Sequence, residues 1–308
     1  MAESDRVSVL IPAFNEENSI GGLIERVKTA GNWLEILVVD DGSSDRTSEA
    51  ARVAGARVVR HPYNKGNGAA VKTAIREARG DLVLLLDADG QHDPQDAPKL
   101  IAPLPEYDLV VGARAWNAQA TLSRGLGNLL LARLASYLCG QKIPDLTSGF
   151  RAARRDRLRE FLHLLPNGFS YPTTSTMAFV RAGYNLCFVA VEGKQRASLS
   201  RSKMHPWREG VRFLVIILRM VTLFSPLRVF LPVAASFFAL GFGYSIYTIA
   251  TELDVTDTSV LFLTASAILL LFGLLSEQIA YLRFQPPPVG TSDGPSRSTP
   301  PSRPPSRV

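Results

Sequence analysis

The sequence is poor in cysteine and lacks an apolar segment near its N-terminus. Its 308 residues include two cysteines, Cys139 and Cys187, whose spacing does not match a metal site. One disulfide is possible on paper, but we expect two reduced cysteines in the core. Residues 1–10 have neither a basic region nor an apolar run, so we expect no cleavable signal peptide. No period indicates internal repeats.

Composition leaves several classes of protein open. A hydrophobic content of 46% allows a sizeable core, and the length allows one large domain or two smaller ones. The net charge of +6 fits nucleic acid, an anionic membrane surface or phosphorylated substrates as partners.

Short apolar runs alternate with amphipathic helices in the first ninety residues. We expect strands at residues 7–11, 34–40, 56–60 and 82–86, with helices between them and a break in the first strand at residues 12–15. This alternation predicts an α/β fold with a mostly parallel, doubly wound sheet. We expect further helices near residues 94–104, 122–138, 154–164 and 172–182, further strands near 109–112 and 186–191, and a turn and strand at 145–151.

The run at residues 82–86 leads directly into two carboxylates. Asp87, Ala88 and Asp89 are followed by Gly90 and Gln91. Open α/β sheets bind ligands beyond the carboxyl ends of their strands, and carboxylate oxygens suit Mg²⁺ or Mn²⁺ on a diphosphate. The alternative for an isolated DxD is a solvated turn without a metal, since Asp and Gly are ordinary turn residues.

The last hundred residues predict a membrane anchor. Residues 205–227 are apolar but carry Arg208, Arg212 and Arg219, which fall within roughly 40° of one another on a helix. This stripe favours a helix in the membrane interface; the alternative is a core helix with an exposed basic stripe. Two apolar stretches, at about residues 229–250 and 258–278, are long enough to span a bilayer. The acidic loop between them and the basic flanks place both termini in the cytoplasm.

Three strand ends together resemble family 2 of the inverting glycosyltransferases, which have the GT-A fold. The segments are IPAFNEEN, VVDDGSSD and DADGQHD, and each is a weak signal alone. The residues that match the family signature are Pro12, Asn15, Glu16, Asp40, Asp41, Gly42, Ser43, Ser44, Asp45, Thr47, Asp87, Asp89 and Gln91. The segments DADGQHDP, Ser148 to Arg151 and Arg196 to Lys203 resemble the dolichol- or polyprenyl-phosphate hexosyltransferase branch. The resemblance covers about residues 6–205.

The resemblance implies a domain organisation and a role for each matching residue. The catalytic domain would be residues 1–204, followed by an interfacial helix at 205–227, two transmembrane helices within 228–283 and a disordered tail at 284–308. The nucleotide sugar would be bound by Pro12, Ala13, Asn15, Glu16, Asp41, Asp87, Ala88 and Asp89. The divalent cation, Mg²⁺ or Mn²⁺, would be held by Asp89 and Gln91. The acceptor phosphate would be bound by Arg114, Arg124, Arg151, Arg196 and Lys203. The groups implied in catalysis are Asp89, Arg124, Arg151 and Arg196.

The implied reaction moves one hexose from a nucleotide sugar to a polyprenyl or dolichyl phosphate. An ionised lipid phosphate needs no strong general base, and arginines screen the two phosphate-bearing substrates from each other. Two departures weaken the match. Asn67 stands where the family often has lysine, so that Lys65 or Lys72 would have to substitute, and the segment from Arg196 to Lys203 lacks the usual glycine.

Several other functions remain to be weighed. A processive polysaccharide synthase would carry a Gln-x-x-Arg-Trp motif, whereas Gln195 is followed by Arg196, Ala197 and Ser198. A Rossmann dehydrogenase would need a third glycine after Gly66 and Gly68. A family 2 enzyme acting on a glycolipid or polysaccharide, and a non-catalytic membrane scaffold, are the remaining alternatives. The sugar donor is left open between GDP-mannose and UDP-glucose.

Overall fold

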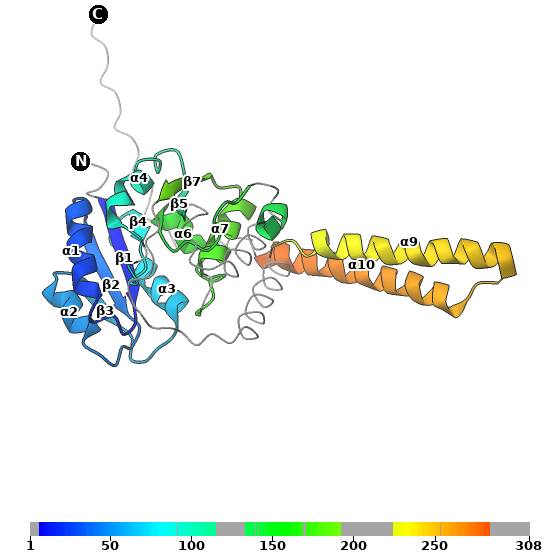
Figure 1. Cartoon of the computed structure of the whole chain (residues 1–308), viewed down its shortest axis with the longest axis horizontal. Helices are drawn as coiled ribbons and strands as arrows, with labels where there is room; N and C mark the ends of the chain where they lie inside the picture. The colour runs from blue at the N-terminus through cyan, green and yellow to red at the C-terminus, as the bar shows by residue number, and fades with distance from the viewer. Residues whose placement is uncertain are drawn as a thin grey trace, which may run out of the picture.

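The part of the chain up to residue 191 is built on one mixed sheet (Figure 1). A computed structural model describes residues 6–90, 92–114, 133–138, 140, 142–168, 171–191, 224–252 and 254–283. The strands lie in the order β3-β2-β1-β4-β6-β5-β7. Their bounds are β1 Val7–Ala13, β2 Glu35–Asp40, β3 Arg57–Arg60, β4 Leu82–Leu85, β5 Leu109–Arg114, β6 Arg151–Arg154 and β7 Leu186–Val191. Only β6 runs against its neighbours β4 and β5, which confirms the predicted mostly parallel sheet.

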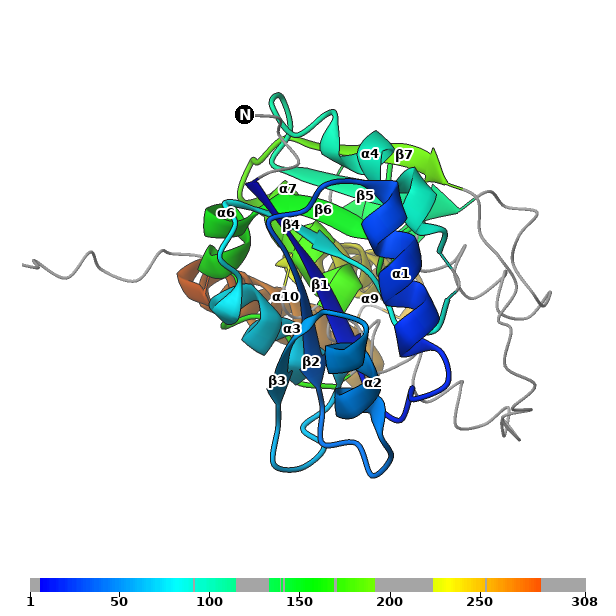
Figure 2. The same ribbon diagram turned by 90° about the vertical axis from the view of Figure 1, so that its left-hand side faces the viewer.

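Helices cover both faces of the sheet. Because side chains alternate along a strand, Val9 of β1 packs with α1 (Ile20–Ala30) on one face, and Leu10 packs with α3 (Asn67–Glu77) on the other. Figure 2 shows α1 and α2 (Thr47–Val53) on one side of the strands and α3 on the other. The α3 face also carries α6 (Arg155–Glu160) and α7 (Tyr171–Arg181), so two apolar clusters hold the sheet.

Strand β1 is longer than predicted, because it continues through Pro12 and Ala13. The carbonyl of Leu10 accepts from Leu86 on the β4 side, so the alternate residue Pro12 has its nitrogen on that side too. The pairing with β4 ends at Leu10 and Leu85. No backbone hydrogen bond to β4 is therefore lost at residue 12, and the strand tolerates a proline there. The sequence prediction of a break at residues 12–15 was therefore wrong by two residues.

The remaining helices differ from the prediction mainly in length. The helix expected near residues 94–104 is a short 3₁₀ turn, η2 (Pro94–Asp96), followed by α4 (Ala97–Ile101). Most of the helix expected at 122–138 lies outside the described residues, of which 133–138 are helical. The interfacial helix was expected at residues 205–227, of which residues 205–223 lie outside the described part of the chain.

Two long helices project from the part that contains the sheet as an antiparallel pair (Figure 1). They are α9 (Leu227–Glu252) and α10 (Asp257–Arg283). Within them Leu227–Thr251 and Asp257–Leu282 are long and apolar enough to cross a membrane, with mean hydropathies of 1.8 and 2.3. Only 17% of each of these apolar segments is buried, so these are not core helices of a soluble domain. A Cβ on Gly241 would lie 2.9 Å from Phe262 Cβ, so the small residue allows close helix packing.

Candidate active site

The predicted site residues gather at one edge of the sheet. Strands β1, β2 and β4 are parallel, so their carboxyl ends at Ala13, Asp40 and Leu85 lie at the same edge. Strand β5 runs in the direction of β4, since both are antiparallel to β6. Arg114, the last residue of β5, and Arg151, the first of β6, therefore have their backbones at this edge as well. The topology thus brings together segments separated by more than a hundred residues in the sequence.

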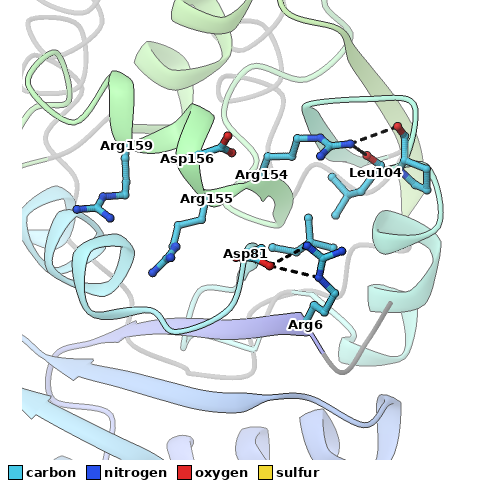
Figure 3. Close-up of a pocket in the computed structure, with 9 residues that line it drawn as sticks. Arg6, Asp81, Leu104, Arg154, Arg155, Asp156 and Arg159 are labelled. Atoms are coloured by element: carbon cyan, nitrogen blue, oxygen red, sulfur yellow. Dashed lines mark hydrogen bonds and ion pairs between the residues drawn. The ribbon is translucent and has the colours of Figure 1, made fainter. Parts of the chain in front are cut away.

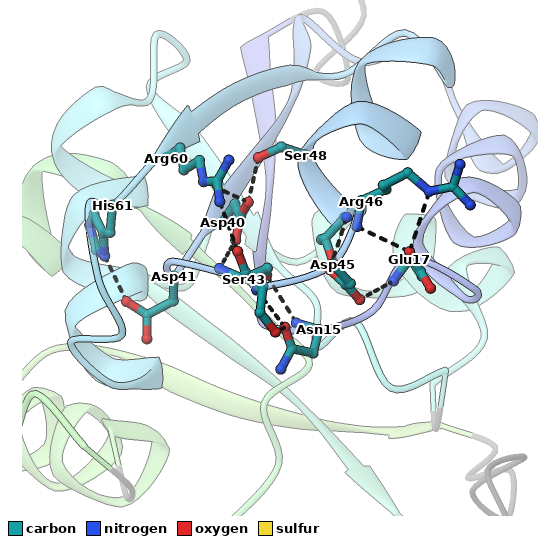
Figure 4. Close-up of polar contacts among 12 residues, drawn as sticks. Asn15, Glu17, Asp40, Asp41, Ser43, Asp45, Arg46, Ser48, Arg60 and His61 are labelled. Carbon is teal, nitrogen blue, oxygen red and sulfur yellow. Dashed lines mark hydrogen bonds and ion pairs between the residues drawn. The ribbon is translucent and has the colours of Figure 1, made fainter.

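The loops after β1 and β2 are joined by hydrogen bonds (Figure 4). Asn15 has a φ of 54°, its N–H donates to Ser43 Oγ at 2.9 Å, and its Oδ1 accepts from the Ser44 amide at 2.9 Å. The Glu16 amide donates to Thr47 Oγ1 at 2.8 Å, while the Glu16 carboxylate accepts from Ser19 Oγ. Asn15 and Glu16 therefore fix the shape of the predicted nucleotide pocket, and their contact with a nucleotide stays a prediction.

Asp40 and Asp41 are adjacent but hold different parts of the site. Asp40 is fully buried, accepts from the Ser43 amide at 2.8 Å and lies 3.6 Å from Arg60 Nε. Asp41 is 2% exposed and turns to the loop after β3 (Figure 4). It contacts His61 Nδ1 at 2.7 Å.

The carboxylate of Asp41 organises the loop that leads into α3. Besides His61, it accepts from the amides of Lys65 at 3.0 Å and Gly66 at 2.7 Å. His61 Nε2 in turn contacts Thr73 Oγ1 at 2.9 Å on α3. The geometry thus gives Asp41 a supporting role in this loop, and its predicted contact with the nucleotide is untested.

The structure places the two lysines that were suggested as substitutes for the family lysine at Asn67. Lys72 Nζ donates to the Leu165 carbonyl at 3.2 Å and to Asn167 Oδ1, so it ties α3 to the turn at 165–168. Lys65 Nζ instead lies 5.5 Å from the centre of the Tyr63 ring. Of the two lysines suggested as substitutes, Lys65 is the one that stays in the loop itself.

The two carboxylates after β4 are half-buried, with the buried Ala88 between them. Asp87 lies against Gly149: a Cβ on that glycine would be 2.0 Å from Asp87 Oδ2. Gly90 has a φ of +71°, a conformation that favours glycine, and it turns the chain directly after Asp89. Asp87 and Asp89 both act on Tyr171: burial raises the pKa of its hydroxyl well above the ordinary value, and the two carboxylates raise that pKa further.

Arg151 is fully buried and lies within range of the charge of Asp87. Its Nη1 donates to the Pro172 carbonyl at 3.0 Å and to Ser175 Oγ at 2.6 Å, and its Nε donates to the Ser148 carbonyl at 3.2 Å. Burial lowers the pKa of Arg151, while the charges of Tyr171, Asp145 and Asp87 act in the opposite direction. Its guanidinium therefore faces protein acceptors in this structure, and its predicted contact with an acceptor phosphate remains a prediction.

Several predicted site residues lie outside the described part of the chain. They are Gln91, Arg124, Arg196 and Lys203, and the side chain of Arg114 belongs with them. Sequence reasoning missed His61 and Tyr171, which no motif marked. It noted Gly149 only as part of a family segment. The signal that could have identified it was the Ser-Gly-Phe-Arg segment downstream of the DxD.

The residues present fit a divalent cation bound together with a diphosphate. No group of three His, Cys, Asp or Glu side chains within the described ranges could hold a metal by itself. Mg²⁺, however, is commonly bound by one or two carboxylates plus substrate phosphates. Asp89, half-buried at a turn on the edge of the sheet, supplies a hard oxygen ligand of this kind.

A mostly parallel sheet with a DxD at its carboxyl edge, followed by an apolar hairpin, defines a membrane-associated glycosyltransferase of GT-A type. The profile of the family "Glycosyl transferase family 2" matches residues 8–162, and that of the "GtrB C-terminal hairpin" matches residues 225–282. The chain therefore belongs to glycosyl transferase family 2.

Relatives and solved structures agree with this assignment. Glycosyltransferase AglJ of Haloferax volcanii is 31% identical over 296 residues, covering 92% of this chain and 96% of that protein. The dolichyl-phosphate hexose transferase of the same organism is 32% identical over 209 residues, covering 67% and 90%. Glucosyl-3-phosphoglycerate synthase from Mycobacterium tuberculosis, solved with Mn²⁺, UDP and glucosyl-3-phosphoglycerate, superposes with a TM-score of 0.55 at 26% identity, covering 70% and 78%. The predicted family and its polyprenyl-phosphate branch are confirmed.

Proposed function

We propose that this enzyme transfers one hexose from a nucleotide sugar to a polyprenyl or dolichyl phosphate with inversion at the sugar carbon. An oxygen of the lipid phosphate attacks that carbon, and the bond from the carbon to the nucleoside diphosphate breaks. The attacking oxygen is already ionised at neutral pH, so the enzyme needs no strong general base. The donor is GDP-mannose or UDP-glucose.

One observation carries this proposal: the half-buried DxD lies in the same chain as two helices able to cross a membrane. A soluble acceptor would need no such hairpin, whereas a lipid phosphate is confined to the bilayer surface. The dolichyl-phosphate hexose transferase relative supports this choice of acceptor.

Each predicted residue has a role in this reaction. Asn15, Glu16 and Asp41 bind or shape the nucleotide pocket, and Asp87 and Ala88 lie against the sugar nucleotide. Asp89 and Gln91 hold Mg²⁺ or Mn²⁺, which when bound offsets the negative charge that develops on the departing diphosphate. The solved relative crystallised with Mn²⁺ and UDP supports this choice of cation. Guanidinium groups screen the phosphates of the two substrates. These groups belong to Arg114, Arg124, Arg151 and Arg196, with Lys203 beside them.

The proposed orientation follows from charge. The linker between the helices carries acidic residues, and arginines flank the outer ends of the hairpin. This charge pattern supports a cytoplasmic location for the catalytic domain (residues 1–204) and both termini. The predicted interfacial helix at residues 205–227, up to residue 223, and the predicted tail at residues 284–308 lie outside the described residues.

A labelling experiment tests the proposal. Membranes containing the full chain are incubated with a panel of radiolabelled nucleotide sugars and polyprenyl phosphate, and the label in chloroform-soluble lipid is measured with and without chelator. We expect one sugar to label lipid in a metal-dependent way. We expect Asp89→Ala to lower this transfer at least about a hundredfold because the diphosphate loses its counter-charge.

The control is Glu25→Ala, which removes an exposed carboxylate from α1 and leaves transfer unchanged. Full activity of chelator-washed Asp89→Ala would overturn the metal assignment. Label found only in water-soluble products would overturn the lipid acceptor, and no transfer of any sugar would favour a scaffold.

A further inference from the structure

A cavity lies at the edge of the sheet opposite the DxD. Its volume is about 450 Å³, the size range of small-molecule sites. Strand β4 begins here at Leu82 and runs toward Asp87, and β6 ends here at Arg154 after starting at Arg151. The cavity and the active site therefore occupy the two ends of the same pair of strands. Its lining residues are Arg6, Asp81, Leu82, Leu104, Pro105, Arg154, Arg155, Asp156 and Arg159 (Figure 3).

The lining has an excess of positive charge. Four arginines face two aspartates, which leaves a formal charge of +2. The bond between Arg6 and Asp81, 2.7 Å long, joins side chains that are 56% and 64% exposed, so it stabilises the fold little and can exchange partners. The guanidinium of Arg159 has no hydrogen bond or ion pair within the part of the chain that the structure describes.

The charges of the other two arginines are only partly neutralised. Arg155 Nη1 donates to the carbonyl of Ala78, which is an uncharged acceptor. Arg154 Nη2 donates to the carbonyls of Leu104 and Pro105 at 3.3 Å, and its Nε lies 3.7 Å from Asp108. Each guanidinium keeps further N–H groups for another acceptor.

The positive charge of the lining affects the pKa of Asp81, a carboxylate in the cavity. The hydrogen bond from Arg6 lowers the pKa of Asp81, and the charges of Arg6 and Arg155 lower it further. An anion placed among the same side chains would experience the same attraction. Phosphate suits such a site best, because its oxygens match the guanidinium fork.

We propose that this cavity binds a phosphorylated small molecule from solution, at a site separate from the nucleotide-sugar pocket. Arg6 binds a phosphate oxygen in place of Asp81, the carboxylate that the ligand displaces, and Arg159 reaches the ligand from the α6 side of the cavity (Figure 3). All of the lining residues belong to the part of the chain before the hairpin, and none of them comes from α9 or α10. This position favours a soluble ligand over a lipid headgroup.

Calorimetric titration of the full chain in detergent with pyrophosphate, without divalent cations, tests the proposal. We expect saturable binding that Arg159→Ala weakens about tenfold, which is the loss of one charge-assisted contact. Asp81→Asn should strengthen the binding, because it removes the competing carboxylate. Arg157→Ala is the matched control: it removes the same charge from the same helix, but Arg157 does not line the cavity and pairs with Glu160 at 3.2 Å.

Three outcomes would overturn the proposal. The first is no saturable binding. The second is equal weakening by Arg159→Ala and Arg157→Ala, which would mean that the net charge of α6 attracts the anion. The third is binding of anionic vesicles through Arg159 without binding of free pyrophosphate, which would make the ligand a lipid headgroup. The nucleotide-sugar pocket contains none of the substituted residues, so failure here leaves the proposed transferase activity untouched.

Discussion

Gly149 lies against the first carboxylate of the DxD. Its missing side chain leaves the space that Asp87 Oδ2 occupies, since a Cβ there would lie 2.0 Å from that oxygen. Gly149 does not have a positive φ, so the requirement for glycine is spatial. Asp87 is thus positioned by a residue that carries no chemistry of its own.

We predict that Gly149→Ala displaces Asp87 and lowers hexose transfer at least about a hundredfold, because catalytic groups tolerate shifts of only about 1 Å. The measurement is the initial rate of lipid labelling, with circular dichroism to show that the sheet is retained. Gly21→Ala is the control: nothing lies within 4 Å of a Cβ there, and alanine in helix α1 should raise stability by about 0.5–1 kcal/mol. A Gly149→Ala enzyme with normal rates would show that the position of Asp87 is not critical.

Single residues also mark the limit of prediction from sequence. The DxD and the two other strand ends were recognisable, because each follows a short apolar run. The burial of Arg151 was not predictable, since its acceptors at Pro172 and Ser175 lie more than twenty residues away and belong to a helix with no charged motif. The contact between Asp41 and His61 was missed for the same reason: it depends on how two loops fold together.

At the scale of elements, the sequence predicted strands better than their ends. The run at residues 186–191 is β7 as expected, and the two apolar stretches became α9 and α10 with a few more residues at each end. The antiparallel direction of β6 had no signal in the sequence, because Arg151 to Arg154 has no turn that fixes its direction. The extension of β1 through Pro12 depends on where β4 stops, and this is set by the tertiary structure.

Glu35 joins several elements at the edge of the sheet opposite the DxD. Its Oε1 accepts from Ser8 Oγ of β1 at 2.7 Å and from the Arg79 amide after α3 at 2.7 Å, and its Oε2 accepts from Arg57 Nε of β3 at 2.8 Å. Burial alone would raise the pKa of Glu35, but the hydrogen bonds from Arg57, Arg79 and Ser8 hold that pKa below its ordinary value of 4.5.

A lowered pKa in the folded state makes stability depend on pH in a defined direction. The stabilisation by Glu35 is present above pH 4.5 and is lost as the pH falls through the lower, folded pKa. We predict that Glu35→Gln lowers the free energy of unfolding by about 1–3 kcal/mol at pH 7 and flattens its decline in acid. Denaturant unfolding in detergent at pH 7 and at stepwise lower pH measures both effects. Glu49→Gln, at an exposed position on α2, should change neither, and an unchanged acid slope in Glu35→Gln would contradict the prediction.

At the scale of the whole molecule, an ion pair joins the catalytic part to the hairpin. Arg181, at the end of α7, contacts Glu277 of α10 with 2.8 Å between Nη2 and Oε1. The other oxygen of Glu277 accepts from the amide of Leu227 at the start of α9, at 3.3 Å. The N-terminal half of α7 binds Arg151, which donates to the Pro172 carbonyl and to Ser175 Oγ. Helix α7 therefore spans the distance from the membrane helices to the catalytic edge.

We predict that Glu277→Gln and Arg181→Met each lower transfer to long-chain polyprenyl phosphate in bilayers about tenfold, equivalent to roughly 1.4 kcal/mol. Transfer to a short, water-soluble prenyl phosphate should change less than twofold, because that acceptor needs no fixed height above the membrane. The charge-exchanged double variant, Arg181→Glu with Glu277→Arg, should regain part of the lost activity.

The contrast between acceptors is what separates positioning from general damage. Breaking a pair that is 32% and 25% exposed also costs some stability, and a merely less stable enzyme would lose activity on both acceptors alike. The control pair, Arg157 and Glu160 on α6, has the same charges at 3.2 Å but contacts only the catalytic part, so Glu160→Gln should spare both activities. If Glu277→Gln lowers both activities equally, the ion pair stabilises the fold without setting the position of the active site over the lipid.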